Sequence, residues 1–105
     1  MADLFEQYVG NELIYQSQHY SPHIKVRYWR DAAGPEIDYV LEISGQYIPI
    51  EVKWTERPRR DDARHVIPFL AEQGAKLAPH GYVICRCPRP ERLDDRVLAL
   101  PWHCL

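Results

Sequence analysis

The chain has 105 residues, of which 46% are hydrophobic and 27% charged, and its formal net charge is −2. A chain of this size buries roughly 65% of the surface that its unfolded form exposes, so one core is feasible without disulfides or a structural metal. The three cysteines are an odd number and make a poor disulfide framework, which argues against a secreted disulfide scaffold. No stretch approaches the ~18 apolar residues of a membrane span, and residues 1–4 lack a signal-peptide pattern. We therefore expect a single cytoplasmic domain over residues 1–105 with no membrane partner.

The first half of the chain predicts a helix followed by three strands. Apolar residues recur at helical spacing over residues 3–18, and Asp3 is placed to cap that helix. The period then changes to two over residues 23–31 and 36–43, which predicts a hairpin around the turn at 32–35. A glycine turn at residues 44–46 leads into a third strand, in which Pro49 suggests an edge position or a bulge.

The second half predicts a helix and then a buried strand. Asp61 or Asp62 can cap a helix running to about Ala78, within which we expect Pro68 to kink or break the helix. Residues 81–87 favour a buried strand, and residues 96–105 a short last strand or tail. The order α-β-β-β-α-β, followed by a weak strand, predicts an α/β fold with a mixed central sheet flanked by helices.

Polar residues that could carry chemistry lie on the second and third strands. Alternation puts Ile37, Tyr39, Leu41 and Ile43 on one face of the second strand, which leaves Asp38 on the other, and it likewise places Glu51 and Lys53 together. A hairpin centred on Gly45 would set residue 38 roughly opposite residues 51 to 53. Two carboxylates suit Mg²⁺ or Mn²⁺, and a nearby lysine can hold or activate the water that attacks a phosphorus atom.

Two acids of the first helix lie near its apolar stripe. Glu6 is at the margin of that stripe, so a helix packed on the sheet would direct it toward the carboxylate cluster. Glu12 lies closer to the centre of the stripe. Either acid could instead pair with an arginine or cap a backbone group, and for Glu12 this structural role is at least as well supported.

These residues sit in motifs that resemble a known superfamily. The helix carries FExxVxxEL, the first hairpin YWRDxxGxEIDYV and the third strand IPIEVKW. The combination resembles the PD-(D/E)XK, restriction-endonuclease-like nucleases, and more closely the nuclease-like domain at the C-terminus of many prokaryotic AAA+ ATPases. The resemblance covers about residues 4–100, although Ile37 replaces the usual proline before the aspartate. No GxxxxGK[ST] motif is present, so these residues offer no P-loop for ATP.

The resemblance implies an activity and assigns residues to it. It implies a Mg²⁺-dependent (or Mn²⁺-dependent) endonuclease acting on DNA, with Asp38 and Glu51 as metal ligands, Lys53 as the catalytic lysine and Glu6 as the helix acid. It also implies an AAA+ ATPase as a partner. The alternative is a non-catalytic nucleic-acid or protein-interaction module of the same fold, working with a separate ATPase. A small oligomer without a DNA role is a third reading, because strands often alternate Glu and Lys on a solvated face.

Two other groups of residues allow weaker hypotheses. Cys85, Cys87, His103 and Cys104 could ligate zinc, but Cys-x-Cys in a strand is more often a pair of packed thiols. Tyr28 and Trp29, beside Arg27 and Arg30, could stack on bases, although strand aromatics usually pack. Four arginines lie in residues 57–64, namely Arg57, Arg59, Arg60 and Arg64. They could bind phosphate groups, or they could simply belong to a solvated loop. If DNA is the substrate, we expect a homodimer that gathers two copies of this segment.

Overall fold

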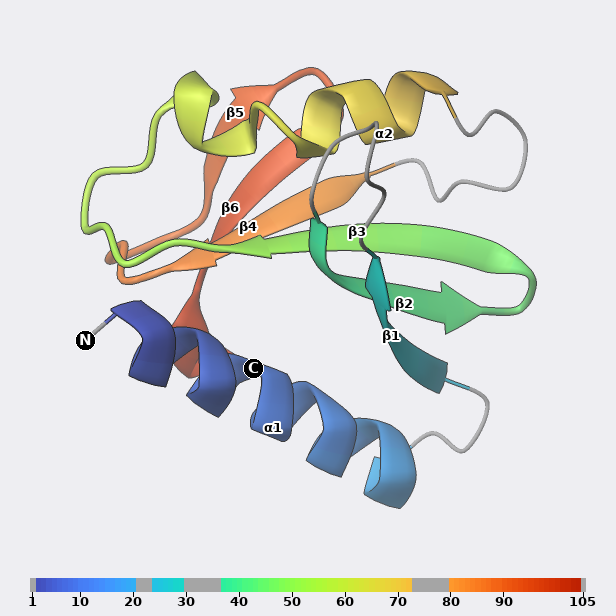
Figure 1. Cartoon of the computed structure of the whole chain (residues 1–105). Coiled ribbons are helices and arrows are strands. Elements are labelled where there is room, and N and C mark those ends of the chain that lie inside the picture. The colour runs from blue at the N-terminus through green and yellow to red at the C-terminus, as the bar shows by residue number, and fades with distance from the viewer. Residues whose placement is uncertain (1, 21–23, 30–36, 73–79, 105) are drawn as a thin grey trace.

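The protein is a mixed six-stranded sheet with a helix on each face (Figure 1). The computed structural model describes residues 2–20, 24–29, 37–72 and 80–104, and it confirms the expected α/β class and element order. Among these residues the strand order is β1-β2-β3-β4-β6-β5. Strands β3, β4 and β6 run parallel, while β1–β2, β2–β3 and β5–β6 are antiparallel pairs. The elements are α1 (Ala2–Tyr20), β1 (Ile24–Trp29), β2 (Ile37–Ile43), β3 (Gln46–Val52), the 3₁₀ turn η1 (Arg60–Ala63), α2 (Val66–Glu72), β4 (Gly81–Cys85), β5 (Glu91–Asp94), β6 (Val97–Pro101) and the 3₁₀ turn η3 (Trp102–Cys104).

The hydrophobic core has a layer on each side of the sheet, as the alternation in β3 predicts. On the α1 side, Phe5 and Val9 pack against strand residues Tyr39, Ile50, Val52 and Ile84. On the α2 side, helix residues pack against strand residues of β2, β4 and β6; this layer contains Ile37, Val40, Ala63, Val66, Phe69, Leu70, Val83 and Val97. Burial on both faces fixes which side of β3 each side chain occupies, and so places Glu51 opposite the α1 layer.

The β2–β3 turn sets the register of the strands that carry the candidate site. Ser44 and Gly45 have φ values of 52° and 80°, the positive values that a tight two-residue hairpin turn requires. Pairing therefore runs from Ile43↔Gln46 to Tyr39↔Ile50. The observed hairpin is centred between Ser44 and Gly45, so the expected centre on Gly45 is wrong by half a residue. That register would have paired Asp38 with Val52, whose side chain belongs to the α1 layer; the observed register brings the start of β2 beside Glu51 instead.

A bulge at the start of β2 changes the direction of its side chains. Arg27 pairs with Val40 and Trp29 with Ile37, so Asp38 and Tyr39 together oppose a single residue of β1. Ile37 consequently belongs to the α2 layer, whereas Tyr39 belongs to the α1 layer. The expectation that Ile37 and Tyr39 share a face is wrong for this reason, and the bulge falls at a predicted site residue.

Of the two prolines that suggested interruptions, Pro49 is accommodated in a regular strand and Pro68 follows a break in the helical segment. Pro49 is buried in β3, a central strand, so the predicted edge position is wrong. The backbone N–H of Lys53 donates to Ile84 of β4, and the N–H groups of every second residue in a strand point to the same neighbour. The N–H that Pro49 lacks would therefore also point toward β4. The parallel ladder with β4 begins only at Ile50, and Pro49 removes no bond from it. Pro68 lies in the first turn of α2, where a missing N–H is tolerated, and the expected break falls just before it, between η1 and α2.

The second helix and the last strands also differ from expectation. The chain forms η1 at the aspartates and α2 only from Val66, while the predicted extension over 73–79 lies outside the described residues. The predicted strand over 81–87 is confirmed as β4, and the weak last strand is β6, buried at alternate positions beside β4. Strand β5 was not expected, because its four residues are mostly charged. None of the described helices has the length and apolarity needed to cross a membrane.

The close approach of α1 to the sheet yields a first prediction. A Cβ atom at Gly10 would collide with the phenol ring of Tyr39, whose hydroxyl donates a hydrogen bond to the backbone oxygen of Glu6 at 3.2 Å. Gly10→Ala should therefore lower the free energy of unfolding by about 1–3 kcal/mol through overpacking, despite the better helix propensity of alanine. Asn11→Ala, at the exposed next position, is the control in urea unfolding. Equal or greater stability of Gly10→Ala would contradict this packing.

Candidate active site

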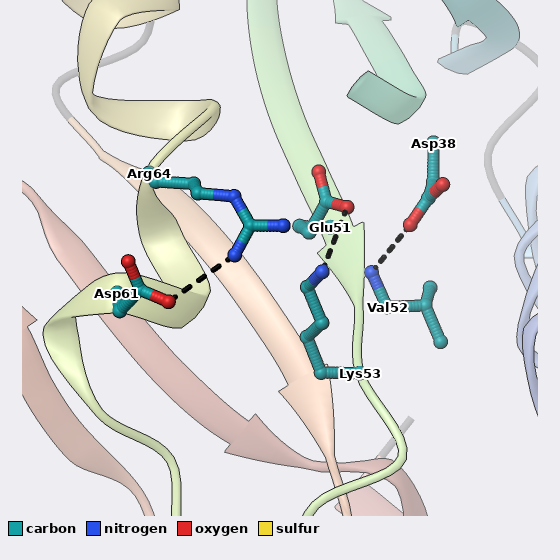
Figure 2. Close-up of polar contacts among 6 residues, drawn as sticks. All are labelled: Asp38, Glu51, Val52, Lys53, Asp61 and Arg64. Carbon is teal, nitrogen blue, oxygen red and sulfur yellow. Dashed lines mark hydrogen bonds and ion pairs between the residues drawn. The ribbon is translucent and has the colours of Figure 1, made fainter. Parts of the chain in front are cut away.

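Three predicted site residues meet where β2 begins and β3 ends (Figure 2). The bulge in β2 carries Asp38, β3 carries Glu51, and Lys53 follows β3 directly. Lys53 Nζ lies 3.8 Å from Glu51 Oε1. The charge of Asp38 acts strongly enough on Glu51 to help raise its pKa. The structure thus brings Asp38, Glu51 and Lys53 together, with Asp38 placed by the bulge rather than by regular alternation.

Asp38 also has a structural role that the sequence pattern does not reveal. Its Oδ2 accepts a hydrogen bond from the backbone N–H of Val52 at 2.8 Å. The paired residues of β2 and β3 stop at Tyr39 and Ile50, so this carboxylate satisfies a donor just beyond the paired backbone. This bond holds the carboxylate against the end of β3 and leaves Asp38 half-buried.

Glu51 is the buried acid of the group, with only 6% of its surface exposed. Burial is the largest cause that raises the pKa of Glu51 from 4.5 to about 8; the charge of Asp38 adds to this rise and the ammonium of Lys53 opposes it. Oxygen Oε2 of Glu51 is buried and finds no hydrogen-bond partner among the described residues. A carboxylate with a buried, unpartnered oxygen would be stabilised by either a proton or a cation at that oxygen.

Of the two acids of α1, Glu6 but not Glu12 acts electrostatically on Glu51, as the smallest of the causes that shift its pKa. The charge of Glu6 is among the causes that raise the pKa of Glu51, which places it within electrostatic reach of the strand carboxylates. Glu12 instead accepts a hydrogen bond from Gln16 one turn later on the same helix, at 3.1 Å. Glu12 therefore has a structural partner, but this partner is the Gln16 side chain rather than the arginine or backbone group that was expected.

The raised pKa of Glu51 predicts how stability depends on pH. Below about pH 4.5 the residue is protonated whether the chain is folded or unfolded, and it adds no pH dependence. Between pH 4.5 and about 8 the folded state binds the extra proton, so the free energy of unfolding falls as pH rises through this window. Glu51→Gln should remove this fall, and above pH 8 it should be more stable than wild type by roughly 1–3 kcal/mol. Chemical denaturation at pH 5 and pH 9 checks this; parallel pH profiles would contradict it.

The donor set of the cluster fits a hard divalent cation only in part. In the described part of the chain, no three His, Cys, Asp or Glu side chains converge closely enough to hold a metal ion. Mg²⁺, however, is commonly held by one or two carboxylates, with water and substrate phosphate oxygens completing its shell. The buried, unpartnered oxygen of Glu51 beside Asp38 fits such a two-carboxylate site.

The other predicted ligand groups are not assembled in this way. Cys85 and Cys87 are buried with Ala99, burial raises the pKa of Cys85 to about 12, and within the described residues they belong to no group of three metal-binding side chains. His103 is exposed on η3. The side chains of Cys104, Tyr28 and Trp29, and residue Arg30, lie outside the described parts.

The arginines of residues 57–64 divide into two pairs. Arg60 forms an ion pair with Asp94 at 3.0 Å, and Arg64 one with Asp61 at 3.2 Å, as expected for a solvated segment. Figure 2 shows Arg64 pointing toward Glu51 from the turn after η1. Arg57 and Arg59 are exposed, and no ion pair is found for their side chains within the described residues.

One feature close to the cluster was missed at the sequence level. A pocket of about 330 Å³ is lined by Phe5, Tyr8, Trp54, Arg86 and Trp102. Its residues come from α1, the segments after β3 and β4, and η3, which are far apart in the chain. Helical spacing marked Phe5 only as a core residue, and the C-terminal tryptophan carried no signal. Only the fold brings these rings together.

Comparison with known proteins gives a family but no activity. No curated protein and no solved structure matches the chain. A family model described as a domain of unknown function, DUF4143, matches residues 1–105. Domains of this kind are commonly found C-terminal to AAA ATPases. Because the match spans all 105 residues, the chain belongs to the DUF4143 family.

Proposed function

We propose that this domain is a nuclease of the PD-(D/E)XK type that hydrolyses phosphodiester bonds in DNA with Mg²⁺ or Mn²⁺. The observation that carries the proposal is Glu51, a buried carboxylate whose Oε2 has no partner among the described residues and whose neighbours are Asp38 and Lys53. Burying a carboxylate without a hydrogen bond is unfavourable for the fold alone. A role in binding a cation explains why an acid is kept there.

Asp38 and Glu51 would hold the cation. When bound, a divalent ion polarises the phosphodiester and lowers the pKa of a coordinated water. The hydrogen bond from Val52 N–H fixes one oxygen of Asp38, which limits the orientations of its carboxylate. Such positioning before the substrate arrives reduces the reorganisation that the reaction requires.

Lys53 and Glu6 would act on the reacting groups around this pair. The Lys53 ammonium, 3.8 Å from Glu51 and partly exposed, is placed to hold the attacking water and to stabilise charge that develops on the phosphate. Glu6, at the margin of the group, would complete the site from α1, so we expect a smaller loss from Glu6→Gln than from changes at either strand carboxylate.

DNA binding by one copy would be weak, because the net charge is −2. A homodimer that brings two segments 57–64 to one duplex would supply the positive surface that phosphate contacts need. The exposed side chains of Arg57 and Arg59 are the members of this segment available for that role.

A second candidate function is a non-catalytic module that serves a separate AAA+ ATPase. Two observations favour it: no three metal-binding side chains converge in the described residues, and the family is commonly found C-terminal to AAA ATPases. In that case the cluster would be a remnant, and DNA or the ATPase would bind without cleavage.

The test is cleavage of labelled DNA, supplied both as a single strand and as a duplex, with Mg²⁺, Mn²⁺ or a chelator. We expect metal-dependent cleavage by wild type and by Glu42→Gln, because Glu42 lies on the same strand β2 but pairs with Arg27 at 2.7 Å. Glu51→Gln should be inactive. Absence of cleavage in every metal would favour the non-catalytic module, and full activity of Glu51→Gln would exclude Glu51 as a ligand and contradict this active site.

A further inference from the structure

The aromatic pocket adjoins a second, polar hollow. The first, of about 330 Å³, is lined by Phe5, Tyr8, Trp54, Arg86 and Trp102. The second, of about 460 Å³, shares Trp54 and Arg86 with it and adds Thr55, Glu56 and Arg57. The two hollows therefore meet at Trp54 and Arg86, which gives this surface an aromatic end and a charged end.

The rings of the aromatic end pack edge to face. Phe5 lies 5.1 Å from Trp54 and 6.4 Å from Trp102 between ring centroids, and Tyr8 lies 5.7 Å from Trp102. This packing holds the rings in place, while Tyr8, Trp54 and Trp102 stay 50%, 39% and 37% exposed. The guanidinium of Arg86 covers the Trp54 ring at 3.7 Å from its centroid. Exposed rings held rigidly next to an arginine are suited to stacking with a flat, electron-rich ligand.

The charged end carries the net positive charge that binding of a phosphate requires. Arg86 is paired with Glu56 at 3.5 Å, so these two charges offset each other. Arg57 is exposed, and in the part of the chain that the structure describes its side chain forms no ion pair. The hollow thus retains one positive charge, matching the single negative charge of a phosphodiester.

This surface lies at the same end of β3 as the carboxylate group but on the other face of the sheet. Trp54 directly follows Lys53 after β3; Trp54 contacts Phe5 on the α1 side, whereas Lys53 pairs with Glu51 on the side opposite the α1 layer. A DNA strand bound at both places would therefore pass around the end of β3, with an unpaired base at the aromatic end and its backbone continuing toward Lys53.

We propose that the aromatic pocket binds an unpaired nucleobase, with a neighbouring phosphate at Arg57, so that the DNA reaching the carboxylate group is single-stranded or locally unpaired. This inference rests on the proposed nuclease function and specifies its substrate class. A base within a duplex is stacked and paired, and its face is not available to Tyr8, Trp54 or Trp102. Aromatic platforms beside cationic tracks are the usual means of binding single strands without sequence preference.

The proposal is tested by measuring how oligonucleotides bind to a variant that is expected not to cleave them. Lys53→Met protein is titrated with three fluorescein-labelled oligonucleotides of equal length: a thymidine single strand, an abasic strand with the same number of phosphates, and a self-complementary duplex. Affinity is read from anisotropy. Intrinsic fluorescence gives a second readout, because Trp54 and Trp102 are two of the three tryptophans of the chain. We expect the single strand to bind about 10-fold more tightly than the abasic strand, as stacking of one base implies, and to quench tryptophan emission.

Protein variants locate the binding. Tyr8→Ala and Trp102→Ala should each remove most of the preference for the thymidine strand over the abasic strand. Tyr15→Ala is the matched control, being an equally exposed tyrosine of α1 outside the pocket, and it should bind like the parent. Arg57→Ala should weaken both strands equally and reduce the salt dependence by about one phosphate contact. Tyr8→Ala removes an exposed ring and keeps the test valid if Trp102→Ala fails to fold.

The outcomes separate this inference from the proposed function. Base-dependent binding that requires Tyr8, found in a protein that cleaves nothing, would contradict the nuclease and retain the base pocket. Metal-dependent cleavage with equal affinity for thymidine and abasic strands would contradict the pocket alone. Tighter binding of the duplex, or a Tyr8→Ala variant that loses an AAA+ ATPase partner but binds oligonucleotides normally, would likewise overturn the inference.

Discussion

Replacing Asp38 by alanine or by asparagine should abolish metal-dependent DNA cleavage, but only alanine should weaken the fold. Both changes remove the negative charge that would help hold the cation. Asparagine retains an oxygen that can accept the Val52 N–H, whereas alanine leaves a buried backbone donor without its partner. The free energy of unfolding should therefore fall by about 1–3 kcal/mol in Asp38→Ala and stay near wild type in Asp38→Asn.

Cleavage assays with denaturant unfolding of both variants check these two effects. Removal of the Glu51 charge should stabilise the fold above pH 8, whereas removal of Asp38 should not, because Asp38 accepts the Val52 N–H. Wild-type stability of Asp38→Ala would contradict the structural role of the Val52 hydrogen bond. Cleavage by Asp38→Asn at the wild-type rate would exclude Asp38 as a ligand.

Lys53→Met should lose cleavage by about 10²-fold or more, the loss expected when one electrostatic stabiliser is removed from a reacting phosphate. Methionine retains much of the apolar stem of lysine, so the packing of this partly exposed side chain should change little. Because both carboxylates remain, binding of Mn²⁺ should persist. Loss of turnover together with retained metal binding is the pattern of a catalytic lysine.

Turnover of Lys53→Met in Mn²⁺ is compared with that of Lys25→Met, which alters an exposed lysine of β1. The control should cleave normally. If Lys53→Met turns over at the rate of the control, Lys53 is a solvated strand lysine, as the non-catalytic reading holds. If it also loses Mn²⁺ binding, its role is to shape the carboxylate pair rather than to act on the phosphate.

The sequence predicted most of the fold and the grouping of the site for one physical reason. Apolar residues at period two along β3 bury Ile50 and Val52 on the α1 side, which leaves Glu51 on the other side with Lys53 beyond it. The same logic on α1 placed Glu6 at the margin of the stripe, where its charge acts on Glu51. Strong periodicity therefore predicted both the secondary-structure elements and the faces on which their acidic residues lie.

The remaining features depend on contacts between segments that are distant in the sequence. The bulge at Asp38 arises from how β1 pairs with β2, and nothing in either strand alone indicates two residues opposite one. The position of Pro49 in a central strand depends on where the parallel ladder with β4 begins. The aromatic pocket joins Phe5, Trp54 and Trp102 only after α1 and η3 meet.

Calorimetric titration with Mn²⁺ tests the central claim most directly, because it asks whether Asp38 and Glu51 form a cation site independently of any substrate. We expect saturable binding by wild type and by Glu42→Gln, and its loss in Glu51→Gln. The buried, unpartnered oxygen of Glu51 is the feature on which this prediction depends. No binding by wild type, or the same binding by Glu51→Gln, would contradict a metal-dependent active site at this position.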